Sequence, residues 1–273
     1  MIYNETAKLI QKADAILICA GAGMGVDSGL PDFRGNQGFW RAYPPYAEKG
    51  LSFVDMANPD WFYRDPEFAW GFYGHRLNLY RNTTPHYGFN ILLKWAQKMK
   101  MGYFVFTSNV DGQFQKAGFS DERIIEVHGS IHYFQCLDNC GKPIFNSNHY
   151  NIEINDATMR ANKPLPSCPN CDSLARPNIL MFGDWGWDSS REEMQRIRYA
   201  NWLSGLDNSN LIIIECGAGT SVPTVRYETE KIANHFNATA IRINTRQAQI
   251  PLPNLSIANG ALETLSQIDK ILN

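Results

Sequence analysis

Residues 15–25 read Ala15-Ile16-Leu17-Ile18-Cys19-Ala20-Gly21-Ala22-Gly23-Met24-Gly25, an apolar run that ends in a glycine-rich turn. A short run without polar alternation is typical of a strand that is buried on both faces of a parallel sheet. Similar runs recur along the chain and are separated by stretches with helical periodicity. The runs are residues 103–107, 211–216 and 239–243, and the helical stretches include residues 6–13, 86–99 and 225–236. This alternation predicts an open, doubly wound α/β sheet.

Two segments interrupt the alternation. Residues 36–85 are rich in aromatic side chains and proline, and we expect them to form a mostly helical insertion. Residues 133–178 contain four of the six cysteines and show no long helical period. A segment of this size is too small to build a core of its own, so we expect a bound metal to order it.

The cysteine spacing suggests which metal this is. The segment contains a C-x3-C pair followed by a C-x2-C pair: Cys136, Cys140, Cys168 and Cys171. Four thiolates hold Zn²⁺ in a closed tetrahedron with no open position for water, so we expect a structural ion. The alternative is a site that has lost its zinc and kept stray thiols. The other two cysteines, Cys19 and Cys216, lie in apolar runs and are expected to pack within strands.

Charge and composition exclude several classes of protein. The 273 residues include 25 basic and 27 acidic side chains, and the formal net charge is -2. We therefore expect neither direct nucleic acid binding nor attachment to an anionic membrane. No apolar stretch is long enough to predict a membrane span, and residues 1–6 show no secretory pattern. These features lead us to expect a cytoplasmic protein with reduced thiols.

The glycines after the first predicted strand suggest nucleotide binding. In an open α/β sheet the ligand crevice lies beyond the carboxyl ends of the strands, where glycines let backbone N–H groups approach a pyrophosphate. The G-x-G-x-G spacing differs from the usual dinucleotide fingerprint. On these residues alone, a plain tight turn is an equal alternative.

A longer pattern decides between the two. The run Gly21-Ala22-Gly23-Met24-Gly25-Val26-Asp27-Ser28-Gly29-Leu30-Pro31-Asp32-Phe33-Arg34-Gly35 resembles the cofactor loop of the sirtuins, the NAD-dependent protein deacylases. Further motifs resemble those of the same family and follow in its order, so that the resemblance covers roughly residues 6–271. These are Thr107-Ser108-Asn109-Val110-Asp111-Gly112, Glu126-Val127-His128-Gly129-Ser130, the cysteine pairs, residues 176–184, Gly219-Thr220-Ser221 and Ile243-Asn244.

The resemblance implies how the chain is organised. It implies a Rossmann-like doubly wound parallel sheet with a small zinc-binding module and a helical module. The NAD-binding large domain would comprise residues 1–35, 86–132 and 179–273, the helical module residues 36–85 and the zinc-binding module residues 133–178. NAD and an acyl-lysine protein or peptide would meet in the cleft between the domains.

The family's catalytic residues correspond to His128, Asn109 and Asp111. By resemblance, His128 is the general base that takes a proton from a ribose hydroxyl after the acyl oxygen has attacked the anomeric carbon and nicotinamide has left. Asn109 and Asp111 would orient the cofactor, although a turn that simply ends the strand is the alternative. Ser108 stands where the family usually has a glutamine, which puts ribose positioning by this residue in doubt.

The remaining cofactor-binding residues follow from the same resemblance. Phe33 would shield the reactive carbon from water. For residues 219–221 and Asn244, the alternative is that they simply form ordinary strand-to-helix turns. The full set is Gly21, Ala22, Gly23, Gly25, Asp32, Phe33, Arg34, Ser108, Asn109, Asp111, Gly219, Thr220, Ser221 and Asn244.

Two pairs of residues are expected to bind the acylated substrate. The peptide would add a strand near Phe182 and Gly183. Tyr73 and Arg76 lie three residues apart, on one face of a predicted helix, and resemble the Tyr-x-x-Arg pair of sirtuins that remove succinyl or malonyl groups. A phenol beside a guanidinium suits a carboxylate. The alternative is that Tyr73 packs inside the module and Arg76 extends to solvent.

The sequence therefore predicts an NAD-dependent protein-lysine deacylase that releases nicotinamide and transfers the acyl group to ADP-ribose. An NAD glycohydrolase or a mono-ADP-ribosyltransferase is the alternative, since both need the same nicotinamide-cleaving residues. A protein that senses NAD without catalysis would be expected to lack His128, Asn109 or Asp111, and all three are present.

Overall fold

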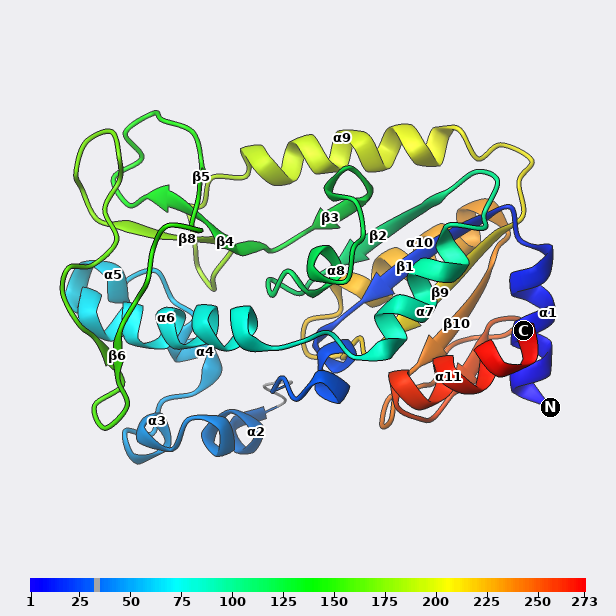
Figure 1. Ribbon diagram of the computed structural model, residues 1–273, viewed down its shortest axis with the longest axis horizontal. Helices are drawn as coiled ribbons and strands as arrows, with labels where there is room; N and C mark the ends of the chain where they lie inside the picture. Colours follow the sequence, from blue (N-terminus) through cyan, green and yellow to red (C-terminus); the bar gives the residue numbers. More distant parts are fainter. Residues whose placement is uncertain (32–34) are drawn as a thin grey trace.

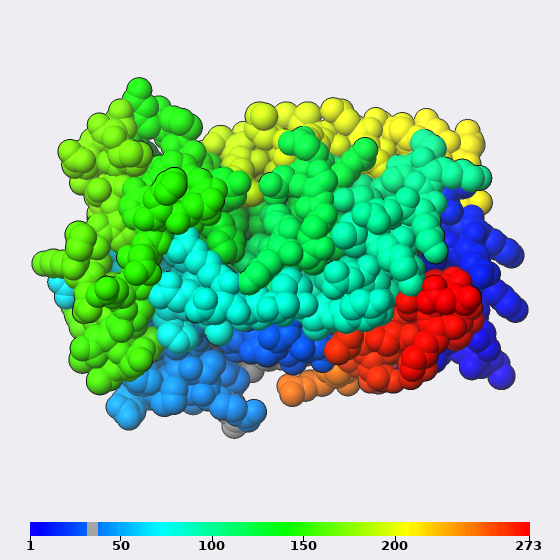
Figure 2. Space-filling view, viewed as in Figure 1, coloured from blue at the N-terminus to red at the C-terminus, as the bar shows by residue number. Residues whose placement is uncertain are grey.

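The computed structural model describes residues 1–31 and 35–273. Figure 1 shows one elongated body, with a large sheet and its helices at one end and a smaller part with short strands and helices at the other. In Figure 2 the small part forms the cyan and green surface at the left, and it joins the sheet region without a break.

A six-stranded parallel sheet forms the large part, with the strand order β11-β10-β9-β1-β2-β3. The strands are β1 (Ala15–Ala20), β2 (Tyr103–Thr107), β3 (Ile124–Glu126), β9 (Leu211–Cys216), β10 (Thr239–Ile243) and β11 (Leu255–Ile257). All six residues of β1 are 0% exposed, as a strand covered on both faces requires. The four predicted strands and the fold class are confirmed, whereas the three-residue strands β3 and β11 were not predicted.

Helices cover both faces of this sheet. One face packs on α1 (Ile2–Lys12), α7 (Tyr87–Ala96) and α11 (Ala261–Leu272), and the other on α9 (Ser190–Ser204) and α10 (Thr224–Phe236). Alternate residues of β1 serve the two cores: Ile16 and Ile18 face the first group, and Leu17 and Cys19 the second. Cys216 packs in the first core, so both isolated cysteines lie within strands as expected.

Two further sets of elements make up the small part. Residues 36–85 form the expected helices: α2 (Gly35–Ala42), α3 (Pro44–Glu48), α4 (Phe53–Met56), α5 (Trp61–Arg64) and α6 (Pro66–Asn82). The antiparallel strands are β4 (Gly129–Cys136), β5 (Phe145–Asn146) and β8 (Ala175–Ile179) in one sheet, and β6 (Ile154–Asn155) with β7 (Arg160–Ala161) in a hairpin. Short turns of helix complete the chain: η1 (Ala22–Ser28), α8 (Gln113–Lys116) and η2 (Asp121–Arg123). The boundaries expected at residues 132/133 and 178/179 fall inside β4 and β8.

Helix α6 is held between the site and the β6–β7 hairpin. Asp65 caps its first turn by accepting a hydrogen bond from the Phe68 N–H, and Pro66 supplies the first helical residue. A Cβ at Gly71 would lie 1.9 Å from the Met159 carbonyl oxygen, so only glycine permits this approach. Asn78 Nδ2 donates to the Ile152 carbonyl at 2.8 Å on the same side. The hairpin therefore holds one face of α6, and this contact fixes the position of the helix face on the other side.

Within the described residues, no helix has both the length and the apolar composition that crossing a membrane requires.

Candidate active site

A cleft of about 720 Å³ opens at the carboxyl ends of β1, β2 and β9, beside α6. This volume is typical of a site for a small molecule or cofactor. Its walls come from the glycine turn (Gly21, Ala22), residues 108–111, His128, residues 179–182, residues 217–222, and the side chains Phe53, Tyr73, Arg76 and Tyr80 of the helical insertion. The fold thus brings together most of the site residues that the sequence predicted.

His128 lies on the wall of the cleft, between β3 and β4. Burial lowers the pKa of its imidazole, and a hydrogen bond to the Ser108 backbone opposes this shift. The neighbouring Gly129 has a φ of 75°, and a Cβ there would lie 2.1 Å from the Asn178 carbonyl oxygen. His128 is therefore a neutral imidazole at neutral pH, held at a point where β4 and β8 meet closely.

Asn109 and Asp111 follow β2 and are buried at the bottom of the cleft. Asn109 Nδ2 donates to the Gly21 carbonyl at 3.1 Å, which ties the end of β2 to the glycine turn. Asp111 Oδ1 accepts the Gln113 N–H at 2.9 Å, so the turn that the sequence offered as an alternative is present as well. Burial raises the pKa of Asp111 to about 6, the charge of Glu126 adds to this, and the nearby Arg76 charge opposes it.

His132 supports this corner without reaching the cleft. Its Nε2 lies 3.0 Å from the Asp111 carbonyl oxygen, and its ring packs where a Cβ at Gly112 would stand. Its position is that of a packing residue.

The glycine turn packs directly against the loop after β9. A Cβ at Gly21 would lie 2.8 Å from the Ala218 Cα, and one at Gly217 would lie 2.3 Å from the Gly23 carbonyl carbon. Gly21 and Ala22 line the cleft, Gly23 borders a separate cavity of about 110 Å³, and Gly25 packs near Leu30. The predicted residues Asp32, Phe33 and Arg34 lie outside the described residues.

The loop after β9 contributes Gly219, Thr220 and Ser221 to the cleft. Asn244 borders the smaller cavity instead: its Nδ2 donates to the Ala218 carbonyl, and its Oδ1 accepts the N–H groups of Arg246 and Gln247. Gln247 Nε2 in turn donates to Thr220 Oγ1 at 2.9 Å. Asn244 therefore positions the loop that presents Gln247 to the cleft.

Arg246 and Gln247 both line the cleft and were missed by the sequence analysis. Their place directly after the predicted motif Ile243-Asn244 was the only signal that could have found them.

The pair Tyr73 and Arg76 lines the cleft from α6. The residue Arg76 is only 6% exposed, so the alternative in which it extends to solvent is wrong. Its Nε and Nη2 donate to Tyr80 Oη at 3.1 and 2.8 Å. Tyr73 Oη is buried and has no hydrogen-bond partner among the described residues. Tyr80 was missed, although its i+4 spacing from Arg76 was a usable signal.

The loop after β8 forms the outer rim. Phe182 lines the cleft, and its N–H donates to the Ala57 carbonyl at 2.9 Å, while Gly183 has a φ of 67° and lies beside it. Asp184 is buried in an ion pair with Arg176 and also accepts the Met181 and Gly186 N–H groups. Asp184 therefore shapes the loop from within, and its carboxylate does not face the cleft.

The four predicted zinc ligands come together in the small part, with all four sulfur atoms within 4.8 Å of one another. The Cys136–Cys171 and Cys140–Cys168 Sγ separations are 3.6 and 3.7 Å. Thiolates at the corners of a tetrahedron with Zn–S bonds of about 2.3 Å would lie about 3.8 Å apart. Asn139, inside the C-x3-C pair, has a φ of 46°. The donor set fits a structural zinc ion.

Comparison with known proteins agrees with this site. The profile of the Sir2 family matches residues 21–211. An NAD-dependent protein deacylase of Pyrococcus furiosus is 33% identical over 183 residues, which cover 67% of this chain and 66% of that protein. One of Pyrococcus abyssi is 28% identical over 265 residues, covering 97% of this chain and 95% of that protein.

Solved structures show the same fold. A Sir2 homologue in complex with NAD matches with a TM-score of 0.70 at 23% identity, covering 98% of this chain and 94% of that one. Sir2 bound to an acetylated peptide matches with a TM-score of 0.68 at 20% identity and covers 100% of both chains. The family match extends over more than half of the chain and includes the glycine turn, Asn109, Asp111, His128 and all four cysteines. The chain therefore belongs to the Sir2 family, the NAD-dependent protein deacylases known as sirtuins.

Proposed function

We propose that this protein removes acyl groups from lysine side chains of protein substrates with NAD as co-substrate, and that the cleft beside β2 is where both meet. The observation that carries the proposal is the convergence of the glycine turn, Asn109, Asp111 and His128 on one cleft. The small-domain zinc has a structural role because four thiolates leave no open coordination position. Four thiols that must stay reduced to bind it favour a reducing compartment such as the cytoplasm.

Each residue has a role that follows from its place. The glycine turn and residues 219–221 present backbone N–H groups and hydroxyls to the phosphates and the adenosine half of NAD. Asn109 and Asp111 orient the nicotinamide ribose. His128, neutral through burial, accepts a proton from a ribose hydroxyl once the acyl oxygen is bonded to the anomeric carbon and nicotinamide has left.

The acyl pocket favours acids. Arg76 supplies a buried positive charge at the cleft wall, and the Tyr73 hydroxyl, which no described residue binds, is available to a ligand oxygen. Burial raises the pKa of Tyr73, so the phenol stays a neutral donor. We therefore propose that succinyl- and malonyl-lysine are preferred over acetyl-lysine, and that the peptide itself lies along Phe182 and Gly183 at the rim.

Product analysis tests the reaction. Incubation with NAD and an acyl-lysine peptide should yield nicotinamide, free lysine peptide and an acyl-ADP-ribose ester, detected by mass spectrometry. His128→Ala should lower turnover by about 10²–10⁴-fold, as expected for loss of a general base, while NAD binding persists. Nicotinamide release that does not depend on the peptide would instead identify a glycohydrolase, and ADP-ribose attached to protein would identify a transferase.

A second experiment tests the acyl preference. We expect Arg76→Met to lower kcat/KM for a succinyl-lysine peptide by about 10–100-fold, the effect of losing a charge-assisted hydrogen bond of about 1.5–3 kcal/mol. Deacetylation of the same peptide sequence should fall much less. Equal losses for both acyl groups would refute an acid-binding pocket at Arg76.

A further inference from the structure

The loop after β8 carries a tryptophan that lies almost entirely in solvent. Trp185 is 99% exposed, and two other apolar residues of the same loop, Leu180 and Phe182, are partly exposed. An indole offers about 150–250 Å² of surface to a partner. A single exposed apolar side chain is common on proteins, so the significance of Trp185 depends on how its loop is held and on what lies beside it.

The loop is held from inside. The Asp184 carboxylate accepts the Met181 N–H and the Gly186 N–H, both at 3.2 Å. The same carboxylate is paired with Arg176, and neither side chain is more than 2% exposed. The backbone on both sides of Trp185 is therefore fixed. A ligand that contacts the indole does not have to order the loop first, which lowers the entropy cost of binding.

The mouth of the cleft beside this loop is apolar as well. The partly exposed apolar side chains that line it are Val54, Leu180, Phe182 and Val222. Trp185 comes three residues after Phe182, so at most about 11 Å separates their Cα atoms. An extended peptide advances about 3.3 Å per residue, and side chains two or three positions from a lysine in the cleft are therefore within reach of the indole.

The surface around the indole favours an apolar partner. Residues 180–187 contain one charged side chain, Asp184, and its carboxylate lies inside the loop. A basic side chain of a substrate would therefore meet no exposed acid in this loop. An aromatic or large aliphatic side chain would remove apolar surface from water on both sides of the contact.

We propose that Trp185 is a specificity-determining residue for the protein substrate: its indole packs against a large apolar side chain two or three residues away from the acyl-lysine. The proposal rests on the deacylase function proposed above, with the peptide along Phe182 and Gly183, and adds the sequence context that the enzyme prefers. Trp185 is not one of the residues that line the cleft, so its contribution appears in peptide binding.

Kinetics on a matched set of peptides test this. The peptides share one acyl-lysine and differ only in carrying Phe or Ser at a single flanking position. At a position two or three residues from the lysine, we expect the wild-type enzyme to have about 10-fold higher kcat/KM for Phe than for Ser, through a lower KM. Trp185→Ala should lower kcat/KM by about 10-fold for that Phe peptide and by less than about 2-fold for its Ser counterpart.

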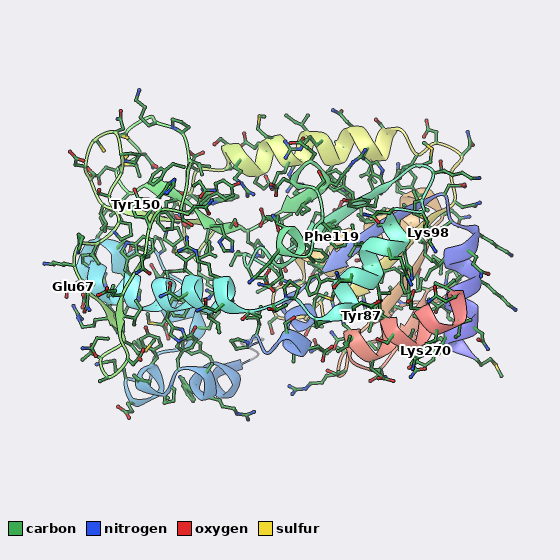
Figure 3. All side chains as sticks on the ribbon, viewed as in Figure 1. Glu67, Tyr87, Lys98, Phe119, Tyr150 and Lys270 are labelled. Carbon is green, nitrogen blue, oxygen red and sulfur yellow. The ribbon has the colours of Figure 1, made fainter. Side chains whose placement is uncertain are left out.

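Two further variants serve as controls. Trp185→Phe should keep most of the preference, because phenylalanine retains an aromatic face at the same point of the loop. Tyr87→Ala is the matched control for loss of an exposed aromatic side chain. Tyr87 is 63% exposed on α7, which packs on the large sheet, and it is labelled in Figure 3. Its replacement should leave kcat/KM for both peptides unchanged.

Three results would overturn the role of Trp185 and leave the deacylase function standing. The first is a wild-type enzyme that deacylates the Phe and Ser peptides equally at every flanking position. The second is a Trp185→Ala variant that keeps the preference or loses activity equally on both peptides. The third is a wild-type preference for Lys or Arg at these positions that Trp185→Ala removes, because the indole would then bind cations.

Failure of the proposed function has a different signature. A wild-type enzyme that releases no free lysine peptide from any member of the set in the presence of NAD refutes the deacylase function, and the role of Trp185 in its specificity with it.

Discussion

Two buried arginines in different regions of the molecule are held in different ways. Arg242, on β10 in the large sheet, is 1% exposed and donates to Glu215 Oε1 and Oε2 at 2.5 and 2.9 Å and to Glu230 Oε1 at 2.9 Å. Arg76, on α6 at the cleft, is held by the hydroxyl of Tyr80 and lies among aromatic rings. Two carboxylates hold the Arg242 guanidinium inside the sheet, whereas the Tyr80 hydroxyl is one of the groups that hold the Arg76 guanidinium at the cleft wall.

The difference shows how to distinguish buried charges that belong to the scaffold from buried charges that serve a binding site. A buried ion pair whose donors are satisfied is part of the scaffold, and removing one partner leaves the other charge uncompensated. A buried charge at the wall of a cleft lies where a bound ligand can contact it. Substitutions in the two regions should therefore change different quantities: the free energy of unfolding in the sheet, and selectivity or pH dependence at the cleft.

The largest effect is expected in the sheet. Arg242→Met should lower the free energy of unfolding by about 3–5 kcal/mol, because Glu215, which is 0% exposed, is left as an unpaired buried charge. Urea unfolding monitored by circular dichroism measures this. The double variant Arg242→Met/Glu215→Leu should recover most of the loss. If Arg242→Met alone lowers the free energy of unfolding by less than about 1 kcal/mol, the ion pair is not structural and the contrast between Arg242 and Arg76 fails.

At the cleft we expect an effect of intermediate size and opposite sign, namely a substitution that raises the free energy of unfolding. The pKa of Asp111 is raised by burial to about 6 from an ordinary value of 3.8, so the folded state holds its proton more tightly than the unfolded state does. The free energy of unfolding falls as pH rises from about 4 to 6. The loss reaches about 3 kcal/mol once Asp111 is ionised in both the folded and the unfolded state. Asp111→Asn should therefore stabilise the protein at pH 7.5 and about half as much at pH 5, while deacylation is lost.

Urea unfolding at the two pH values measures that gain. Asp184→Asn is the matched control, because Asp184 is paired with Arg176 and should lose stability instead. A gain for Asp111→Asn that is the same at pH 5 and pH 7.5 would contradict the assigned origin in the buried carboxylate.

The smallest expected effect is a shift of a pH profile, and it tests whether the Arg76 charge acts on Asp111. This charge lowers the pKa of Asp111, so Arg76→Met should raise that pKa and move the acid limb of the deacetylation pH profile to higher pH. The profile of kcat/KM against pH for an acetyl-lysine peptide measures the shift. Arg64→Met, which removes a surface arginine with a 76% exposed side chain, should leave the limb in place. An unmoved limb in Arg76→Met would show that the charge does not act on Asp111.

Particular residues show how far the sequence could predict the fold. The strands of the sheet were predictable wherever the run is uniformly apolar, because burial on both faces leaves no polar alternation, as residues 15–20 show. The strands β3 and β11 have three residues each, too few for any period to be recognised. The helix before β1 begins four residues earlier than expected, since Ile2 and Tyr3 pack on the core.

In the candidate site, too, some residues were predictable from the sequence and others were not. The motifs around Asn109, Asp111 and His128 were readable because their family order is specific. Tyr80 and Gln247 belong to no such motif, and their only signals were the i+4 spacing of Tyr80 from Arg76 and the place of Gln247 after Asn244. The function of Asp184 as an internal brace and the burial of Arg76 depended on partners that only packing supplies.

By itself, the sequence determined the parallel sheet, the glycine turn at its carboxyl edge, the set of four clustered cysteines and the family, because apolar runs, glycine spacing and cysteine spacing are local patterns. The tertiary structure decided which groups surround each buried charge, since this depends on side chains that meet across the fold. Arg242 and Arg76 are both arginines in the sequence. Glu215 packs against Arg242 inside the sheet and Tyr80 packs against Arg76 at the cleft wall, so the first arginine is part of the scaffold and the second borders the site.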